Sequence, residues 1–236
     1  MVMTPIPAAR ELSAIPDRVD QPRTRSAMKR AQIIDIAMRH FAERGFEEAR
    51  VGDMADELGI AKGSVFQHFG SKNGLFFEAY KKAVRSLPSY MQAPVDVLRK
   101  GFFETLGYWL IRTEHLVHED WIPYCVSLLG NHGTDLSLKR QINRFLVSED
   151  PYGTVAFVKL GLKRGELRSD IDLEMIVSIL DWTMERFQDA LLTEELDPGL
   201  FRRNGPAAEK KEARIEQFLR VLRGAIGRPG VSSLKF

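Results

Sequence analysis

Apolar residues recur along the chain at intervals of three and four positions, which is the spacing of one face of an α-helix. Glycines at positions 45, 59 and 70 are expected to end the first three helices, because glycine readily adopts the backbone of a helix C-cap. Ser71 is a suitable N-cap for the fourth helix, and Pro88 is expected to stop it. The expected apolar residues of these four helices are Ile34, Ala37, Met38 and Phe41; Val51, Met54, Ala55 and Leu58; Val65, Phe66 and Phe69; and Leu75, Phe76, Ala79, Tyr80, Ala83 and Leu87.

The same periodicity continues through the rest of the chain. Further helices are expected at 97–112, 120–129, 136–146, 152–164 and 172–192, with a last helix that carries Ile215, Phe218, Leu219, Leu222 and Ile226. Residues 165–168, Gly-Glu-Leu-Arg, are expected to form a turn, and residues 197–206 a polar loop. No segment alternates apolar and polar residues between hairpin turns, so the sequence predicts an all-α fold without a sheet.

Composition argues against several classes of protein. Of 236 residues, 44% are hydrophobic and 28% are charged, which is ordinary for a soluble globular protein. No apolar run approaches the roughly 20 residues that span a bilayer, and residues 1–25 lack the apolar core of a signal peptide. The single cysteine, Cys125, fits a reducing compartment. We therefore expect a cytoplasmic protein with no membrane partner. Motifs for phosphate loops, nucleophile elbows and metals are missing, so we expect neither an enzyme nor a cofactor.

Positive charge is concentrated in one segment of about domain size. The formal net charge is only +2, but residues 21–85 contain 12 Lys or Arg against 8 Asp or Glu. This bias suits contact with a phosphate backbone, although a solvated surface is the alternative. A Pro-rich tail, residues 1–24, precedes the segment and ends in basic residues. Its basic end is either an arm for a minor groove or part of a solvated tail.

Residues 51–69 form the pattern of a helix-turn-helix. Two short helices are joined at 58–61, where Gly59 permits the tight turn and Ile60 is expected to pack between the helices. The second helix of such a motif lies in the major groove, where its outward side chains reach base edges.

The outward residues of the second helix suggest individual roles in DNA contact. Lys62 and His68 can meet phosphates, and Gln67 can read adenine through two hydrogen bonds. Ser64 can take either role, and Gly63 lets the backbone approach DNA closely.

Lys72 is placed in the first turn of the fourth helix, where the helix dipole does not favour a cation. A nearby phosphate would explain this choice, because the helix N-terminus and the ammonium group would bind it together.

The stretch VGDMADELGIAKGSVFQHFGSK at 51–72, preceded by FAERGF at 41–46, resembles the DNA-binding signature of the tetracycline-repressor (TetR) family. The resemblance covers about residues 27–80. Beyond Pro88 it extends only to the number and order of helices and to the 165–168 turn. It implies a homodimer that binds double-stranded operator DNA and carries an effector cavity in its C-terminal region.

The chain departs from the family pattern at three positions. Ala61 stands where the family usually has a capping Ser or Thr, so the recognition helix is expected to begin less stably, by about 1 kcal/mol. Phe66 replaces the usual Tyr, which removes a hydroxyl but leaves a ring for a thymine methyl. Arg50 replaces a common Thr and offers a charged contact to phosphate. The operator sequence therefore cannot be inherited from relatives.

We accordingly expect four regions: the tail at 1–24, a helix-turn-helix domain at 25–70, a connecting helix at 71–88 and an effector-binding and dimerisation domain at 89–236. The apolar stripes of the last two helices are predicted to form the dimer seam, or else the core of each protomer. The predicted seam residues are Ile176, Leu180, Met184, Phe187, Leu191, Ile215, Phe218, Leu219 and Leu222.

Bulky aromatic residues in the middle helices predict an apolar pocket for a lipophilic effector, with ordinary core packing as the alternative. The candidate pocket residues are Phe102, Phe103, Trp109, Trp121 and Tyr124. His115 and His118 have the spacing of metal ligands but lack an evident third ligand, so no metal site is predicted. Cys125 is expected to be a buried structural thiol rather than a redox sensor.

These features predict a transcription regulator that is a repressor, since a bound dimer blocks polymerase and no activation domain is evident. An effector would favour a dimer whose recognition helices are wrongly spaced for two half-sites, with the fourth helix as the lever. The alternative function is a structural or nucleoid-associated DNA-binding protein of the same fold that has no effector.

Overall fold

The computed structural model describes residues 24–90, 92–132, 135–193, 196–200 and 208–230. Within these ranges the chain is helical, and its one β-type contact is an isolated antiparallel bridge between Leu167 and Gly227. The all-α prediction is confirmed. The helices are α1 (Arg25–Glu48), α2 (Val51–Glu57), α3 (Lys62–Phe69), α4 (Lys72–Tyr90), α5 (Val95–Lys100), α6 (Phe102–Glu119), α7 (Trp121–His132), α8 (Leu136–Glu149), α9 (Thr154–Lys163), α10 (Leu173–Leu192) and α11 (Ala208–Ile226).

The first four helices lie where the sequence predicts them, with two differences at their ends. α1 continues past Gly45 to Glu48, although Gly45 has the expected non-helical backbone. Pro88 lies inside α4 rather than stopping it. A proline in the last turn removes a single backbone hydrogen bond, so α4 continues to Tyr90. Ser71 accepts a hydrogen bond from the Gly74 amide at 3.0 Å, as expected of an N-cap.

The helix expected at 97–112 is two helices in the structure, α5 and α6. The chain breaks at Gly101, whose φ of 141° is accessible to glycine but not to residues with a side chain. A Cβ atom there would lie 2.6 Å from an oxygen of Glu104 and 2.9 Å from an oxygen of Glu166. The periodic pattern did not show this break, because apolar residues continue at helical spacing on both sides.

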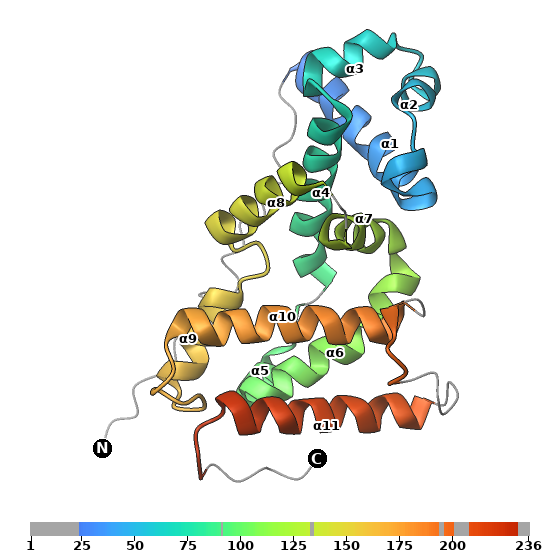
Figure 1. The fold of residues 1–236 in the computed structure, drawn as a ribbon. Helices are drawn as coiled ribbons and strands as arrows, with labels where there is room; N and C mark the ends of the chain where they lie inside the picture. Colours follow the sequence, from blue (N-terminus) through green and yellow to red (C-terminus); the bar gives the residue numbers. More distant parts are fainter. Residues whose placement is uncertain (1–23, 91, 133–134, 194–195, 201–207, 231–236) are drawn as a thin grey trace.

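The interior divides into two separate hydrophobic clusters. The first core joins α1–α4 to α7 and α8, and its largest fully buried side chains include Tyr80, Phe41 and Phe76. The second core is formed by α6, α9, α10 and α11 around Phe102, Phe103 and neighbouring aliphatic residues. In Figure 1, α2 and α3 lie at one end of the molecule and α11 at the other. The first core thus contains helices from both sides of residue 88.

The predicted 165–168 turn fastens the second core to the end of α11. The Glu166 carboxylate accepts a hydrogen bond from the Phe102 amide at the start of α6, and its backbone carbonyl accepts one from the Arg228 amide.

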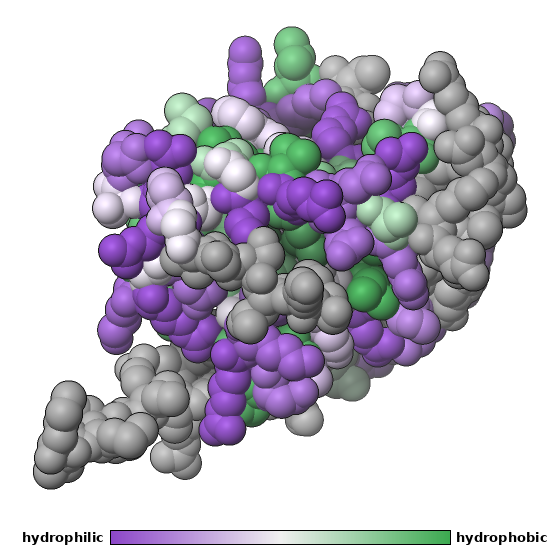
Figure 2. Space-filling view, turned by 90° about the horizontal axis from the view of Figure 1, so that it is seen from below, coloured by the Kyte–Doolittle hydropathy of each residue, from purple (hydrophilic) through white to green (hydrophobic). Residues whose placement is uncertain are grey.

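The α11 end of the molecule is mainly hydrophilic, with several hydrophobic side chains among the polar ones (Figure 2).

Candidate nucleic-acid interface

Helices α2 and α3 form a helix-turn-helix whose turn depends on Gly59. Its φ of 63° reverses the chain between the helices. The Ile60 amide donates to the Ala55 carbonyl at 3.0 Å, and the Ile60 side chain packs against the first core. Val65 is the buried residue of α3, with 1% of its surface exposed. α3 therefore packs on the domain through Val65 and the partly buried Phe69, and its exposed side chains lie on the remaining surface.

The predicted contact residues of α3 lie mainly on this outward surface. Lys62, Gly63 and Gln67 are exposed, and Ser64 and His68 are half-buried. Phe66 is 36% exposed, unlike Val65, the apolar residue that precedes it. A ring on the solvent side fits the predicted contact with a thymine methyl. The Lys62 ammonium lies 5.9 Å from the centre of this ring.

The N-termini of α2 and α3 lack side-chain caps. Ala61 occupies the N-cap of α3 with extended backbone and makes no capping hydrogen bond, as expected from its departure from the family pattern. Arg50 occupies the N-cap of α2, is exposed and also makes no capping bond. A helix N-terminus and an exposed arginine both favour a nearby anion.

Lys72 has a partner that the sequence did not reveal. Its ammonium donates to the Glu47 carbonyl at 2.9 Å and lies 4.8 Å from the centre of the Phe46 ring. The C-terminus of a helix carries partial negative charge, so Lys72 stabilises the end of α1. The lysine is therefore explained without a phosphate, and its side chain is half-buried at the start of α4, next to the end of α3.

Three residues of α1 beside the helix-turn-helix were not among the predicted contacts. Arg25, Lys29 and Gln32 border a hollow of about 340 Å³ whose other wall includes Leu58 and Ile60 of the α2–α3 turn. The signal in the sequence was the pair of basic residues four positions apart, directly after the Thr24 N-cap. These side chains extend the polar surface beyond α3.

Residues 33–79, which include all of α2 and α3, match the family model described as bacterial regulatory proteins, tetR family. The transcriptional repressor KstR2 of Rhodococcus jostii is 30% identical over 167 residues, which are 64% of this chain and 74% of that protein. This chain belongs to the TetR family. It is a DNA-binding transcription regulator, and not an enzyme.

Other TetR-family proteins show the same relationship over much of the chain. The transcriptional repressor AcnR of Corynebacterium diphtheriae is 24% identical over 165 residues, 70% of this chain and 81% of that protein. A crystal structure of a TetR-family regulator from Shewanella sp. PV-4 has a TM-score of 0.61 at 14% identity, covering 84% of this chain and 98% of that one. The latter likeness shows the shared fold. In the described part of the chain, no helix combines the length and apolarity needed to cross a bilayer.

The structure of this TetR-family chain brings three of the predicted effector-pocket residues together in the second core, Phe102, Phe103 and Trp109, and places Trp121 and Tyr124 on α7. Phe102 and Phe103 are buried in the second core, where Phe102 stacks on Phe157 with ring centres 4.2 Å apart. Trp121 is 39% exposed. The Tyr124 hydroxyl lies 3.1 Å from the Thr193 hydroxyl, and burial raises the tyrosine pKa to about 12.

Trp109 retains an unused hydrogen-bond donor. Its Nε1 is buried and has no hydrogen-bond partner among the described residues. The ring itself packs against Phe157 in the second core, with centres 4.6 Å apart. A buried donor without a partner is costly. An acceptor atom placed next to Trp109 Nε1 would remove that cost.

The predicted dimer-seam residues lie inside the protomer. They belong to its core, which was the alternative to their facing a second chain. They pack against α6 and α9, so the stripes on α10 and α11 are used within one chain. Phe187 and Phe218 stack with ring centres 4.1 Å apart. The buried members are Ile176, Leu180, Phe187, Leu191, Ile215, Leu219 and Leu222, while Met184 and Phe218 are partly buried in the same core.

Other faces of α10 and α11 expose large apolar residues. Met175 and Trp182 of α10 are 47% and 64% exposed, and Val221 of α11 is 69% exposed. Sequence periodicity did not select these residues, because isolated apolar positions on a polar face do not alter the dominant stripe.

Metal and redox chemistry gain no support from the geometry. No group of three or more His, Cys, Asp or Glu side chains suited to a metal occurs within the described residues, and the side chain of His118 lies outside them. His115 is exposed. Cys125 is half-buried, and burial raises the pKa of its thiol, which makes the reactive thiolate less available.

Proposed function

We propose that this TetR-family regulator is a repressor that binds a specific operator as a homodimer, with α3 of each protomer in the major groove. The observation that carries this proposal is the row of exposed polar side chains on α3 above a single buried anchor, Val65. The relatives KstR2 and AcnR are both named as transcriptional repressors. Residues 25–70 would form the DNA-binding domain and residues 71–88 the helix that connects it to residues 89–236.

Direct reading of bases would be carried by the middle of α3. Gln67 is exposed and has the amide group that pairs with adenine, while the exposed ring of Phe66 would contact a thymine methyl. Gly63 has open space where a side chain would stand, which supports close approach of the backbone to DNA.

Phosphate contacts would surround this centre. Lys62, His68 and Arg50 would each meet the backbone directly, and Ser64 would serve either base or phosphate. Lys72 would approach a phosphate while holding the end of α1. Such contacts fix the position of the protein without selecting sequence.

The dimer would form through the outer faces of α10 and α11, centred on Trp182. Trp182 and Met175 are exposed on α10 and Val221 is exposed on α11, and large exposed apolar side chains mark surfaces that bind a partner. Gly224 of α11 has no neighbour within 4 Å of a Cβ position, which leaves room for close helix packing. Trp182→Glu should yield a monomer in sedimentation or light scattering, whereas a dimer of unchanged stability would refute this surface.

A small lipophilic effector would release the repressor by binding in the C-terminal domain near Trp109. The unpartnered Trp109 donor would meet an acceptor group of the ligand. α4 is suited to transmit the change. Its Tyr80 hydroxyl bonds Asn131 of α7 at 3.1 Å, and its Asn73 amide bonds Asp135, the N-cap of α8, at 2.7 Å.

Selection from a randomised duplex pool at a stated salt concentration tests the proposal. Recovery of a palindromic site that Gln67→Ala binds more weakly would support a specific repressor. Gln141→Ala, which alters an exposed glutamine of α8, is the matched control and should bind like the parent. Weak, salt-sensitive binding without an enriched sequence would favour the structural DNA-binding alternative.

A further inference from the structure

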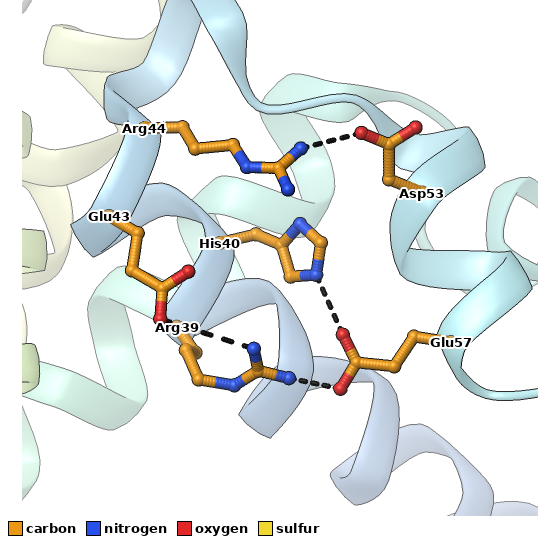
Figure 3. A network of polar contacts seen from close by, with 6 residues as sticks. All are labelled: Arg39, His40, Glu43, Arg44, Asp53 and Glu57. Carbon is orange, nitrogen blue, oxygen red and sulfur yellow. Dashed lines mark hydrogen bonds and ion pairs between the residues drawn. The ribbon is translucent and has the colours of Figure 1, made fainter.

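Two polar ties fasten α2 along α1, one at each end of the short helix (Figure 3). At the start of α2, the Arg44 guanidinium lies 2.6 Å from the Asp53 carboxylate. At its end, the Glu57 carboxylate is shared: one oxygen pairs with Arg39, and the other lies 2.9 Å from Nε2 of His40. The helix between these ties has only seven residues.

His40 is the buried member of the network. It is 4% exposed, whereas the side chains of Arg39 and Glu57 are 37% and 38% exposed. The hydrogen bond from His40 is the largest influence that lowers the pKa of Glu57, and Arg39 adds to it. The imidazole thus binds the carboxylate from inside the domain, and Arg39 binds it from the solvent side.

The imidazole also carries a cost. Its Nδ1 is buried and has no hydrogen-bond partner among the described residues. An apolar side chain at this place, next to the buried Phe41, would fill the core without that penalty. Because one of its buried nitrogens has no partner, the imidazole packs no better than an apolar side chain would. The favourable contribution of His40 to the domain must therefore come from the hydrogen bond between Nε2 and Glu57.

That bond acts on the part of the domain that would read DNA. Glu57 is the last residue of α2, and four residues separate it from the start of α3 at Lys62. α3 packs on the first core through Val65 and the partly buried Phe69, and the α2–α3 turn joins its start directly to Glu57, so a movement of α2 also moves the start of α3. A shift at Glu57 is therefore passed directly to the recognition helix.

We propose that His40 is a positioning residue for DNA recognition, whose Nε2–H donates to Glu57 and fixes the orientation of α2 and hence of α3. The inference rests on the proposed operator binding. Arg39 is not equivalent, because an exposed ion pair between two flexible side chains contributes little, whereas a buried ring holds one geometry.

The test compares His40→Leu, His40→Gln and the control Arg39→Ala in the full-length protein. Each variant is titrated with the selected operator and with random duplex at a temperature well below its unfolding midpoint. His40→Leu should lose about tenfold in operator affinity, the effect of one charged hydrogen bond, with little change on random duplex. His40→Gln should recover most of the loss, because its amide can donate from nearly the same position as Nε2. Arg39→Ala should stay within about twofold.

Two results would overturn the positioning role: operator affinity of His40→Leu equal to that of the parent, or no recovery in His40→Gln. If His40→Leu does not fold, Glu57→Ala removes the same bond from the solvent side and should also lose about tenfold. Unchanged operator affinity in that variant would refute the role equally. Failure of the parent protein to select any sequence would instead overturn the proposed function, and the positioning role with it.

Discussion

Gly74→Ala should destabilise the protein through a contact between α3 and α4. A Cβ atom on Gly74 would lie 2.1 Å from the Phe69 carbonyl oxygen and 3.3 Å from its carbon. Both atoms belong to the backbone at the end of the recognition helix, so no side-chain rotation relieves the clash. The two helices would have to separate by about 1 Å.

The magnitude follows from two opposed effects. Forcing an extra carbon into a packed contact costs about 1–3 kcal/mol. Alanine in a helix is favoured over glycine by about 1 kcal/mol, which offsets part of that cost. We expect a net loss of about 1–2 kcal/mol in the free energy of unfolding, together with weaker operator binding because α3 is displaced.

Gly52→Ala is the matched control, because a Cβ atom on Gly52 of α2 would have no neighbour within 4 Å. It should gain up to about 1 kcal/mol. Urea denaturation of the parent and both variants, at one protein concentration, measures the differences. An unfolding midpoint for Gly74→Ala at or above that of Gly52→Ala would refute the reasoning, since the contact would then cost nothing.

Three further predictions concern other parts of the chain. Gly101→Ala should lower the free energy of unfolding by about 1–3 kcal/mol in urea denaturation, because a φ of 141° is strained for alanine and its Cβ would press on the Glu104 and Glu166 carboxylates. An unchanged midpoint would count against the break between α5 and α6. Ala61→Ser should raise the thermal midpoint by supplying the missing N-cap of α3, worth about 1 kcal/mol, and a lower midpoint would show that the cap position is misassigned. Arg168 lowers the pKa of Asp170 to about 2. The stabilisation of the folded state by this ion pair is therefore complete when the pH is above 3.8, the ordinary pKa of an aspartate, and is lost as the pH falls toward 2. Asp170→Asn should flatten this acid limb of stability against pH, and a curve that overlays the parent would contradict the pairing.

Sequence periodicity predicted the helices well because one face of most of them is buried. Ile33, Met54, Leu75 and Ile176 are all fully buried on helices that apolar spacing had placed within a few residues of their observed ends. Gly59 and Ser71 then located the turn and the cap, since each residue type has a local conformational reason to stand there.

Spacing alone could not show which surface covers a buried stripe. Leu180 and Leu219 form the same pattern whether they face the protomer interior or a second chain, and the structure places them in the interior. The partner of Lys72 was hidden for a related reason. Glu47 lies 25 positions away, and its backbone carbonyl leaves no mark in the sequence. His40 gave no signal either, because a single polar residue beside Phe41 does not disturb the apolar stripe.

The division of the interior into two hydrophobic clusters has a consequence for how such a chain can diverge. Substitutions in the second core, around Phe102 and Ile176, alter packing among α6, α9, α10 and α11 and leave the contacts of α1–α4 in place. A lineage could therefore change the packing of these four helices while preserving the packing that holds the helix-turn-helix. The two hydrophobic clusters should also unfold separately, so amide hydrogen exchange would resolve two cooperative units with different opening free energies.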